Sequence, residues 1–294
     1  MKDKIFVVPQ NDLESVAIVA LLKEQGYKVG EDLFITKQGW GASWEALEPE
    51  IRDAIAQHDP SKVYGVELKG KSPYNNVDHH DYCDKNWSTG EVLYEEKRSI
   101  LPDGSPAKSS LEQVAILTDT QITRDMAFIA ANDVGFVDEM MRLGKEYGMT
   151  PEEIADTVLA IRMREHTILS VVQGITAEME QQAEEAIKNA HKLPNGTMVV
   201  NLPHSRCATV TDRLPMQEYE GGLLIVCGDG ETDYYGPSEN VQSLASQFGG
   251  WSGNTQMPYT FWGSSDGSIQ SEVVEAVAQF EPDRGKDEVG DDAI

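Results

Sequence analysis

The chain of 294 residues is 40% hydrophobic, and its 24 basic and 50 acidic residues give a net charge of −26. This length accommodates two domains of ordinary size, and the hydrophobic content is typical of a folded protein. The acid excess argues against binding to long duplex nucleic acid, because that affinity comes mainly from Lys and Arg neutralising phosphates. Solubility is the alternative reason for much of this charge.

No stretch approaches the roughly 20 consecutive apolar residues of a membrane-spanning helix. The start of the chain, Met1–Lys4, leads into an apolar run too short for a signal peptide. We therefore expect a cytoplasmic protein with no membrane partner. The three cysteines, Cys83, Cys207 and Cys227, lack paired metal spacing and are expected to be reduced. Cys83 is the one candidate for a catalytic thiol, because it lies just past the histidine pair.

The first part of the chain alternates predicted strands with predicted helices. Apolar runs predict strands at 5–8, 33–35 and 62–68, and helical spacing predicts helices at 13–25 and 44–57. This alternation favours an α/β fold with a parallel sheet covered by helices on both faces.

Acidic and imidazole side chains follow these strands. Asp12 and Glu14 come after the first strand, Glu67 ends the third, and His79 follows the next short apolar run. Ligands collect at the carboxyl ends of parallel strands, and mixed carboxylate and imidazole ligands suit Mn²⁺ or a similar divalent ion. Ordinary alternatives remain open: Asp12 and Glu14 can cap a helix, and Glu67 can form a salt bridge.

The tripeptide Asp78-His79-His80 concentrates most of the chemistry. Successive side chains of a strand point to opposite sides unless the chain turns between them, and a strand end provides such a turn. One imidazole can then bind a metal while the other contacts an anionic substrate. Asp78 can accept a hydrogen bond that fixes a tautomer. A pair of solvated surface histidines is the alternative.

Helices are predicted from Ser109 and from Thr123 to Ala130, followed by a turn that presents Asp133. An Asn-Asp turn without function is the alternative. Further helices at 151 onward and 176–189 precede a break at 191–196, where we place the connection between domains. We therefore expect domains at 1–190 and 197–281 and a disordered acidic tail at 282–294.

The smaller second domain is expected to be α/β as well, with strands at 198–202 and 222–227 and helices at 238–247 and 268–280. Between these helices lie the candidate substrate-binding residues Gly249, Gly250, Trp251 and Ser252. Glycines let backbone N–H groups approach phosphate, and Trp251 or Trp262 is suited to stack on a base. Turn glycines with core tryptophans are the equal alternative. Arg206 and Arg213 are candidate phosphate clamps, since a guanidinium binds phosphate in bidentate fashion.

Taken together, this order of motifs resembles the DHH phosphoesterase superfamily over nearly all of the chain. That family includes exonucleases, nano-RNA and phosphoadenosine phosphatases, cyclic dinucleotide phosphodiesterases and inorganic pyrophosphatases, which use two Mn²⁺ ions. The resemblance implies the metal ligands Asp12, Glu14, Glu67, His79 and Asp133. It implies that His80, supported by Asp78, contacts the phosphate.

The sequence departs from the family pattern in two ways: the histidine of the first motif is absent, and two of the aspartates are replaced by glutamate. Gln10, or Val8 in the looser spacing, stands where the family has a histidine, and Glu replaces Asp at Glu14 and Glu67. The resemblance implies hydrolysis of a small phosphorylated or nucleotide-like compound with Mn²⁺, or with Mg²⁺ or another divalent ion in its place; a homodimer is compatible with it. The alternatives are a catalytically silent nucleotide sensor of the same fold and an acidic scaffold with a vestigial site.

Overall fold

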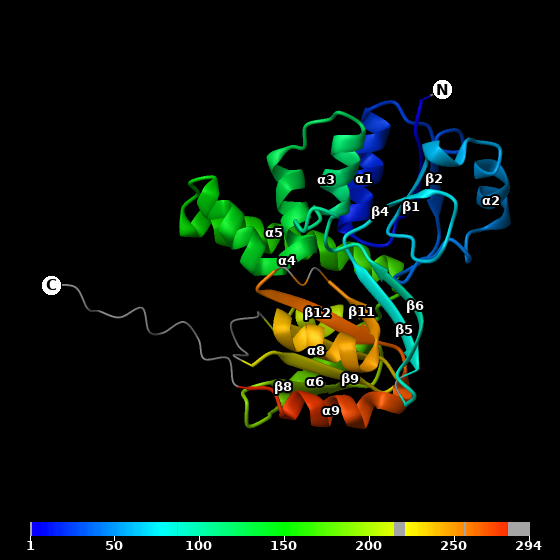
Figure 1. Cartoon of the computed structure of the whole chain (residues 1–294). Helices are drawn as coiled ribbons and strands as arrows, with labels where there is room; N and C mark the ends of the chain where they lie inside the picture. The colour runs from blue at the N-terminus through cyan, green and yellow to red at the C-terminus, as the bar shows by residue number, and fades with distance from the viewer. Residues whose placement is uncertain (1, 87, 215–220, 254, 256, 282–294) are drawn as a thin grey trace.

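The computed structural model describes residues 2–86, 88–214, 221–253, 255 and 257–281. The predicted acidic tail, 282–294, lies outside the described residues. The described part forms two sheets, each covered by helices, with helices α4 and α5 between them (Figure 1).

The first sheet is entirely parallel, in the order β2-β1-β3-β4. Its strands are β1 (Ile5–Pro9), β2 (Leu33–Thr36), β3 (Val63–Val66) and β4 (Asn75–Val77). Side chains of β1 alternate between two cores, because successive residues of a strand point to opposite faces. Phe6 and Val8 pack with the larger group of helices, while Ile5 and Val7 pack on the side of α2.

The helices of this first part bracket the sheet on both faces. They are α1 (Leu13–Glu24), α2 (Pro49–Ile55), α3 (Ser110–Leu117), α4 (Arg124–Glu146) and α5 (Pro151–Val172), with a 3₁₀ turn η1 (Pro60–Lys62). The predicted helix at 44–57 is wrong at its start, because Pro49 occupies the first turn and begins the helix there. Trp44 lies in the preceding loop, where its buried indole packs over Gly65 and donates to Asn76.

The second sheet has eight strands within the described residues, in the order β6-β5-β11-β12-β10-β9-β8-β7. Its own domain supplies β7 (His191–Lys192), β8 (Met198–Leu202), β9 (Leu223–Cys227), β10 (Thr232–Pro237), β11 (Gly250–Ser252) and β12 (Tyr259–Ser264). Helices α6 (Ala177–Lys188) and α7 (Ala208–Thr211) contribute to one core of this sheet. Helices α8 (Ser238–Phe248) and α9 (Gln270–Ala278), with the 3₁₀ turn η3 (Gly267–Ile269), contribute to the other.

A hairpin from the first part of the chain completes this sheet. Strands β5 (Asp81–Asn86) and β6 (Glu91–Lys97) leave the first sheet directly after His80 and run alongside the second (Figure 1). Strand β5 pairs antiparallel with β11, with Ser252 opposite Asp81. The hairpin therefore ties the predicted domain 1–190 to the predicted domain 197–281 through backbone hydrogen bonds.

The predicted α/β class is confirmed, including the parallel sheet with helices on both faces and the second, smaller α/β unit. The domain limits stay a prediction, since the hairpin extends the second sheet across them. None of the described helices combines the length and the apolar character needed to cross a membrane.

Candidate metal centre

The ends of the parallel strands and two neighbouring helices bring four predicted metal ligands together. Glu67 follows β3, His79 follows β4, Glu14 lies in the first turn of α1, and Asp133 lies on α4. One ligand atom from each of these four side chains lies within 4.8 Å of the others. Residues separated by more than 100 positions thus share one small volume, as the rule for carboxyl ends of parallel strands predicts.

The His79 imidazole lies at the middle of this group. Its side chain is 1% exposed, and Nε2 lies 2.6 Å from Asp133 Oδ2 and 3.7 Å from Glu67 Oε1. The contact with Asp133 does not have hydrogen-bond geometry, and neither ring nitrogen has a hydrogen-bond partner among the described residues. A buried Nε2 without a hydrogen-bond partner, beside the oxygens of two carboxylates, is unfavourable unless a cation or a proton compensates it.

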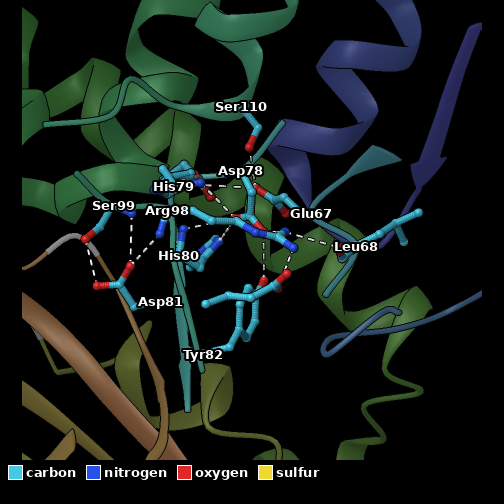
Figure 2. Close-up of polar contacts among 12 residues, drawn as sticks. Glu67, Leu68, Asp78, His79, His80, Asp81, Tyr82, Arg98, Ser99 and Ser110 are labelled. Carbon is cyan, nitrogen blue, oxygen red and sulfur yellow. Dashed lines mark hydrogen bonds and ion pairs between the residues drawn. The ribbon is translucent and has the colours of Figure 1, made fainter. Parts of the chain in front are cut away.

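The two glutamates each use one oxygen for support. Glu14 Oε1 accepts a hydrogen bond from the backbone N–H of Leu111, and Glu14 Oε2 has no partner among the described residues. Glu67 Oε1 accepts from the Ser110 hydroxyl at 3.0 Å (Figure 2). Both supporting groups come from the first residues of α3, so this helix fixes the orientation of both carboxylates.

The backbone of Glu67 is itself unusual. Its φ of 49° lies in the left-handed region, which is rare and costly for a residue with a Cβ. The conformation is retained because the Glu67 N–H donates to Val77 O while the side chain turns toward His79. Strain of this kind is typical of sites where side-chain placement matters more than local stability.

Asp133 is presented from within a helix. Asp133 itself is helical, and the predicted break lies two residues later: within α4 (Arg124–Glu146) the non-helical residues Gly135 and Phe136 separate two helical segments. A Cβ on Gly135 would lie 2.7 Å from both Glu139 Cβ and Met257 Cε, so the kink depends on glycine. Glycine therefore marks a bend in α4 beside the site.

Asp78 is held by a dense set of donors that Figure 2 shows. Its Oδ1 accepts from the backbone N–H groups of His79 and His80, and its Oδ2 accepts from Tyr82 Oη and Arg98 Nη1. Although burial disfavours its charge, the hydrogen bond with His80 and the nearby Arg98 hold the pKa of Asp78 well below its usual range. Asp78 is therefore a fixed anion that does not itself point into the metal cluster.

His80 is oriented by this anion. Its Nδ1 lies 2.9 Å from Asp78 Oδ1, and its ring centroid lies 4.2 Å from that of His79. Burial and His79 lower the pKa of His80, but Asp78 and Glu67 outweigh them and raise it. Because the ionised Asp78 accepts the Nδ1 proton, Nε2 is the ring atom available to a bound ligand.

The buried carboxylates of the cluster are close enough to repel one another, and this repulsion shifts pKa values within it. Burial, together with Asp133 and Glu67, raises the pKa of Glu14, and burial with Glu67 and Asp12 raises that of Asp133. Burial opposes a charge on His79, yet the adjacent Glu67 and Glu14 raise its pKa to about 9. Protons thus compensate part of the buried charge in the metal-free protein, and three carboxylates with one imidazole fit a divalent ion in their place.

The predicted ligand Asp12 lies near Glu67 but outside the group of four converging side chains. Its carboxylate caps α1, since Oδ1 accepts from Ser15 N at 2.7 Å, as the helix-cap alternative expected. Burial and the neighbouring Glu67 raise its pKa to about 6. Asp12 is close to Glu67 but is not one of the four converging ligands, and Gln10, in the place of the family histidine, is exposed.

The predicted substrate-binding segment lies next to this site by way of the second sheet. Trp251 pairs with Tyr82, and Ser252 pairs with Asp81, directly after His80. Gly249 and Gly250 have φ of 74° and 93°, and a Cβ on either would collide with backbone carbonyls of neighbouring strands. These glycines are required for the sheet; their contact with phosphate stays a prediction.

Two further interpretations are decided by burial. Stacking of Trp262 on a base is wrong, because its ring is fully buried and Nε1 donates to Gly249 O. Burial and Glu95 raise the pKa of Cys83 above its ordinary value, which opposes the thiolate that a nucleophile requires.

The two candidate phosphate clamps have protein partners. Arg206 Nε donates to Gln173 O, and Arg213 forms ion pairs with Glu180 and Glu184. Their role with phosphate stays a prediction.

Sequence reasoning missed three residues that support the site. Arg98 fixes Asp78, Ser110 supports Glu67, and the buried Glu165 on α5 accepts from the N–H of Leu13 at the start of α1. Arg98 and Glu165 lie in charged stretches without a motif. The capping box that begins at Ser109 was visible in the sequence, but the contact of Ser110 with Glu67 depends on the tertiary structure.

The comparisons with known proteins add no argument to the description of the fold or the site. No protein-family model and no curated protein matches the chain. Among solved structures, the chain is similar to a pGpG-specific phosphodiesterase, PggH, from Vibrio cholerae, with 9% identity over 94% of this chain and 98% of that one. The TM-score is 0.31, and a likeness of this size carries no inference about function.

Proposed function

We propose that this protein is a metal-dependent phosphoesterase that hydrolyses a small nucleotide-like phosphodiester or phosphomonoester. The convergence of Glu14, Glu67, His79 and Asp133, with buried atoms that have no hydrogen-bond partner in the described part of the chain, carries the proposal. The order of these residues along the chain, which resembles the DHH superfamily, supports it. Mn²⁺ is the proposed ion, and Mg²⁺ is the next candidate because both accept oxygen-rich sites.

Four residues would hold the principal ion, and Asp12 with Glu67 a second one. When bound, such ions neutralise the carboxylates, polarise a phosphoryl oxygen and lower the pKa of a water molecule. Ser110 and the N–H of Leu111 hold the two glutamates in place before any ligand binds. The protein thus supplies an arranged set of donors rather than one assembled on binding.

His80 is the proposed phosphate-contacting residue. Asp78 holds its Nδ1 proton, so Nε2 is left to donate to a phosphate oxygen when the ring is charged. The raised pKa of His80 favours this charged form. Arg98 contacts Asp78, keeps it ionised and is a positioning residue.

A substrate screen tests the proposal. Chelator-treated protein resupplied with Mn²⁺ is offered short oligonucleotides, cyclic dinucleotides, phosphoadenosine and pyrophosphate, and phosphate-ester cleavage is followed. We expect turnover of at least one compound and its loss in His79→Ala. Turnover that survives His79→Ala would contradict the assignment of the metal ligands.

A catalytically silent nucleotide sensor is the second candidate. The exposed Gln10 and the helix-capping role of Asp12 favour it, because both weaken the ligand set of the second ion. Protein that binds Mn²⁺ and retains a nucleotide but cleaves none of the compounds would support the sensor over the enzyme.

A further inference from the structure

A second group of metal-binding atom types lies in the second domain. Cys207, immediately before α7, and Cys227, at the end of β9, place their Sγ atoms 3.7 Å apart. Cys207 Sγ lies 3.1 Å from Asp233 Oδ2 on β10. One ligand atom from each of the three residues lies within 4.8 Å of the others, and all three residues are buried.

The surroundings of this group are apolar. Both cysteines belong to the core formed by α6, α7, β8 and β9. Asp233 pairs with Ile225 in the sheet and points into the same core. A carboxyl group in such a place is costly unless its partners compensate it. Asp233 Oδ2 accepts a hydrogen bond from the Cys207 thiol, and Asp233 also contacts the carboxyl of Glu231; neither partner carries positive charge.

The distances match a bound ion better than a covalent bond between the sulfurs. Two sulfurs that each lie about 2.3 Å from a tetrahedral Zn²⁺ are separated by roughly 3.8 Å. The sulfurs of a disulfide are separated by only about 2.05 Å. The observed 3.7 Å excludes a disulfide and matches the first arrangement, and it is also the distance of a hydrogen bond between two thiols.

The supporting structure keeps the three residues in place. The turn that links β9 to β10 is closed by a hydrogen bond from Cys227 N to Glu231 O. Gln270 Nε2 donates to the carbonyls of both Cys227 and Glu231 from outside the turn. Glu231, in contact with Asp233, is a candidate for a fourth ligand position.

We propose that Cys207, Cys227 and Asp233 bind a structural Zn²⁺ ion. Thiolates select Zn²⁺, whereas the oxygen-rich cluster around His79 suits Mn²⁺ or Mg²⁺. The chain thus carries two centres of different ligand chemistry. The zinc ion joins α7 to β9 and β10, and it is independent of the phosphoesterase proposal.

Cobalt substitution tests this assignment. Full-length protein is produced in medium in which Co²⁺ replaces Zn²⁺, and its near-ultraviolet spectrum is recorded for thiolate-to-cobalt charge transfer. We expect the band in the wild type and its loss in Cys207→Ser and Cys227→Ser. The matched control Cys83→Ser keeps the band, because Cys83 lies on β5 and is not part of the group. His79→Ala also keeps it, since the other centre has no sulfur.

The wild-type protein alone can overturn the proposal, even if the serine variants do not fold. A cobalt-grown wild type without the charge-transfer band would do so. A Cys207–Cys227 disulfide, detected by mass spectrometry as the loss of two hydrogens in protein isolated without reductant, would also do so. One equivalent of zinc per chain in protein grown without cobalt, lost in Asp233→Asn, would support the assignment.

Discussion

Arg98, just beyond the hairpin strand β6, contacts Asp78 at the end of the parallel sheet, with Nη1 2.8 Å from Oδ2. The Asp78 side chain is fully buried, and that of Arg98 is 11% exposed. Arg98 Nη1 also donates to Leu68 O, and Nη2 pairs with Glu96. This pair fixes the acid that orients His80, and it anchors the hairpin to the first sheet.

Replacing Arg98 with Met should therefore destabilise the protein. The change removes the charge and leaves a buried carboxylate, which costs on the order of 2–3 kcal/mol where backbone donors still support it. Denaturant unfolding measures the free energy. Arg142→Met is the matched control, because Arg142 is exposed and its pairs with Glu139 and Glu146 contribute under about 1 kcal/mol. Equal losses in the two variants would contradict the role given to Arg98.

The buried Glu165 predicts a pH dependence of stability. Burial and Asp12 raise its pKa to about 8, so the folded protein keeps a proton that the unfolded chain loses near its ordinary pKa of 4.5. Glu165 binds more protons in the folded state in this window, so its contribution to the free energy of unfolding falls as pH rises from about 5 to 8.

Glu165→Gln should reduce this fall in metal-free protein. The slope should become less steep by up to about 1.4 kcal/mol per pH unit, while the amide oxygen still accepts from Leu13 N. Denaturant unfolding at a series of pH values measures it. An unchanged slope would show that Glu165 is ionised in the folded protein.

Adding a methyl group at Gly135, in the kink of α4, should destabilise the folded protein. Gly135→Ala places a Cβ against Glu139 and Met257, and overpacking of this kind costs about 1–3 kcal/mol. Asp133 lies two residues before Gly135 in α4. A shift of the backbone at Gly135 should therefore displace the Asp133 carboxylate and lower the affinity for Mn²⁺. Gly39→Ala is the control, since nothing lies within 4 Å of its added Cβ and its φ is not positive. Indistinguishable melting temperatures for the two variants would contradict the account of the kink.

Several site residues could be predicted because their position relative to a strand end determines where they lie. Glu67 and His79 follow strands of one parallel sheet, so their convergence follows from topology alone. Asp133 was predicted as a ligand but assigned to a turn, because small residues and glycine are typical of turns. Asp133 is helical, and the glycine forms the break two residues further on, at Gly135 and Phe136.

Other features depend on contacts that no local pattern reveals. The hairpin β5–β6 is polar and half-exposed, and its partner β11 lies more than 160 residues later in the chain. The sequence does not predict the contact between the Cys207 and Cys227 thiols, because the spacing of the two residues matches no metal motif. Asp233 lies beside them only because β10 pairs with β9.

The measurement that bears most directly on the central claim is a Mn²⁺ titration of chelator-treated protein, followed by melting temperature. A ligand that binds only the folded state stabilises it by about 2.7 kcal/mol at 100 times its dissociation constant. We expect a saturable rise in the wild type and in His191→Ala, whose histidine is exposed on β7, and none in His79→Ala. A wild type that Mn²⁺ does not stabilise, or a His79→Ala variant that it stabilises equally, would contradict a metal centre at Glu14, Glu67, His79 and Asp133.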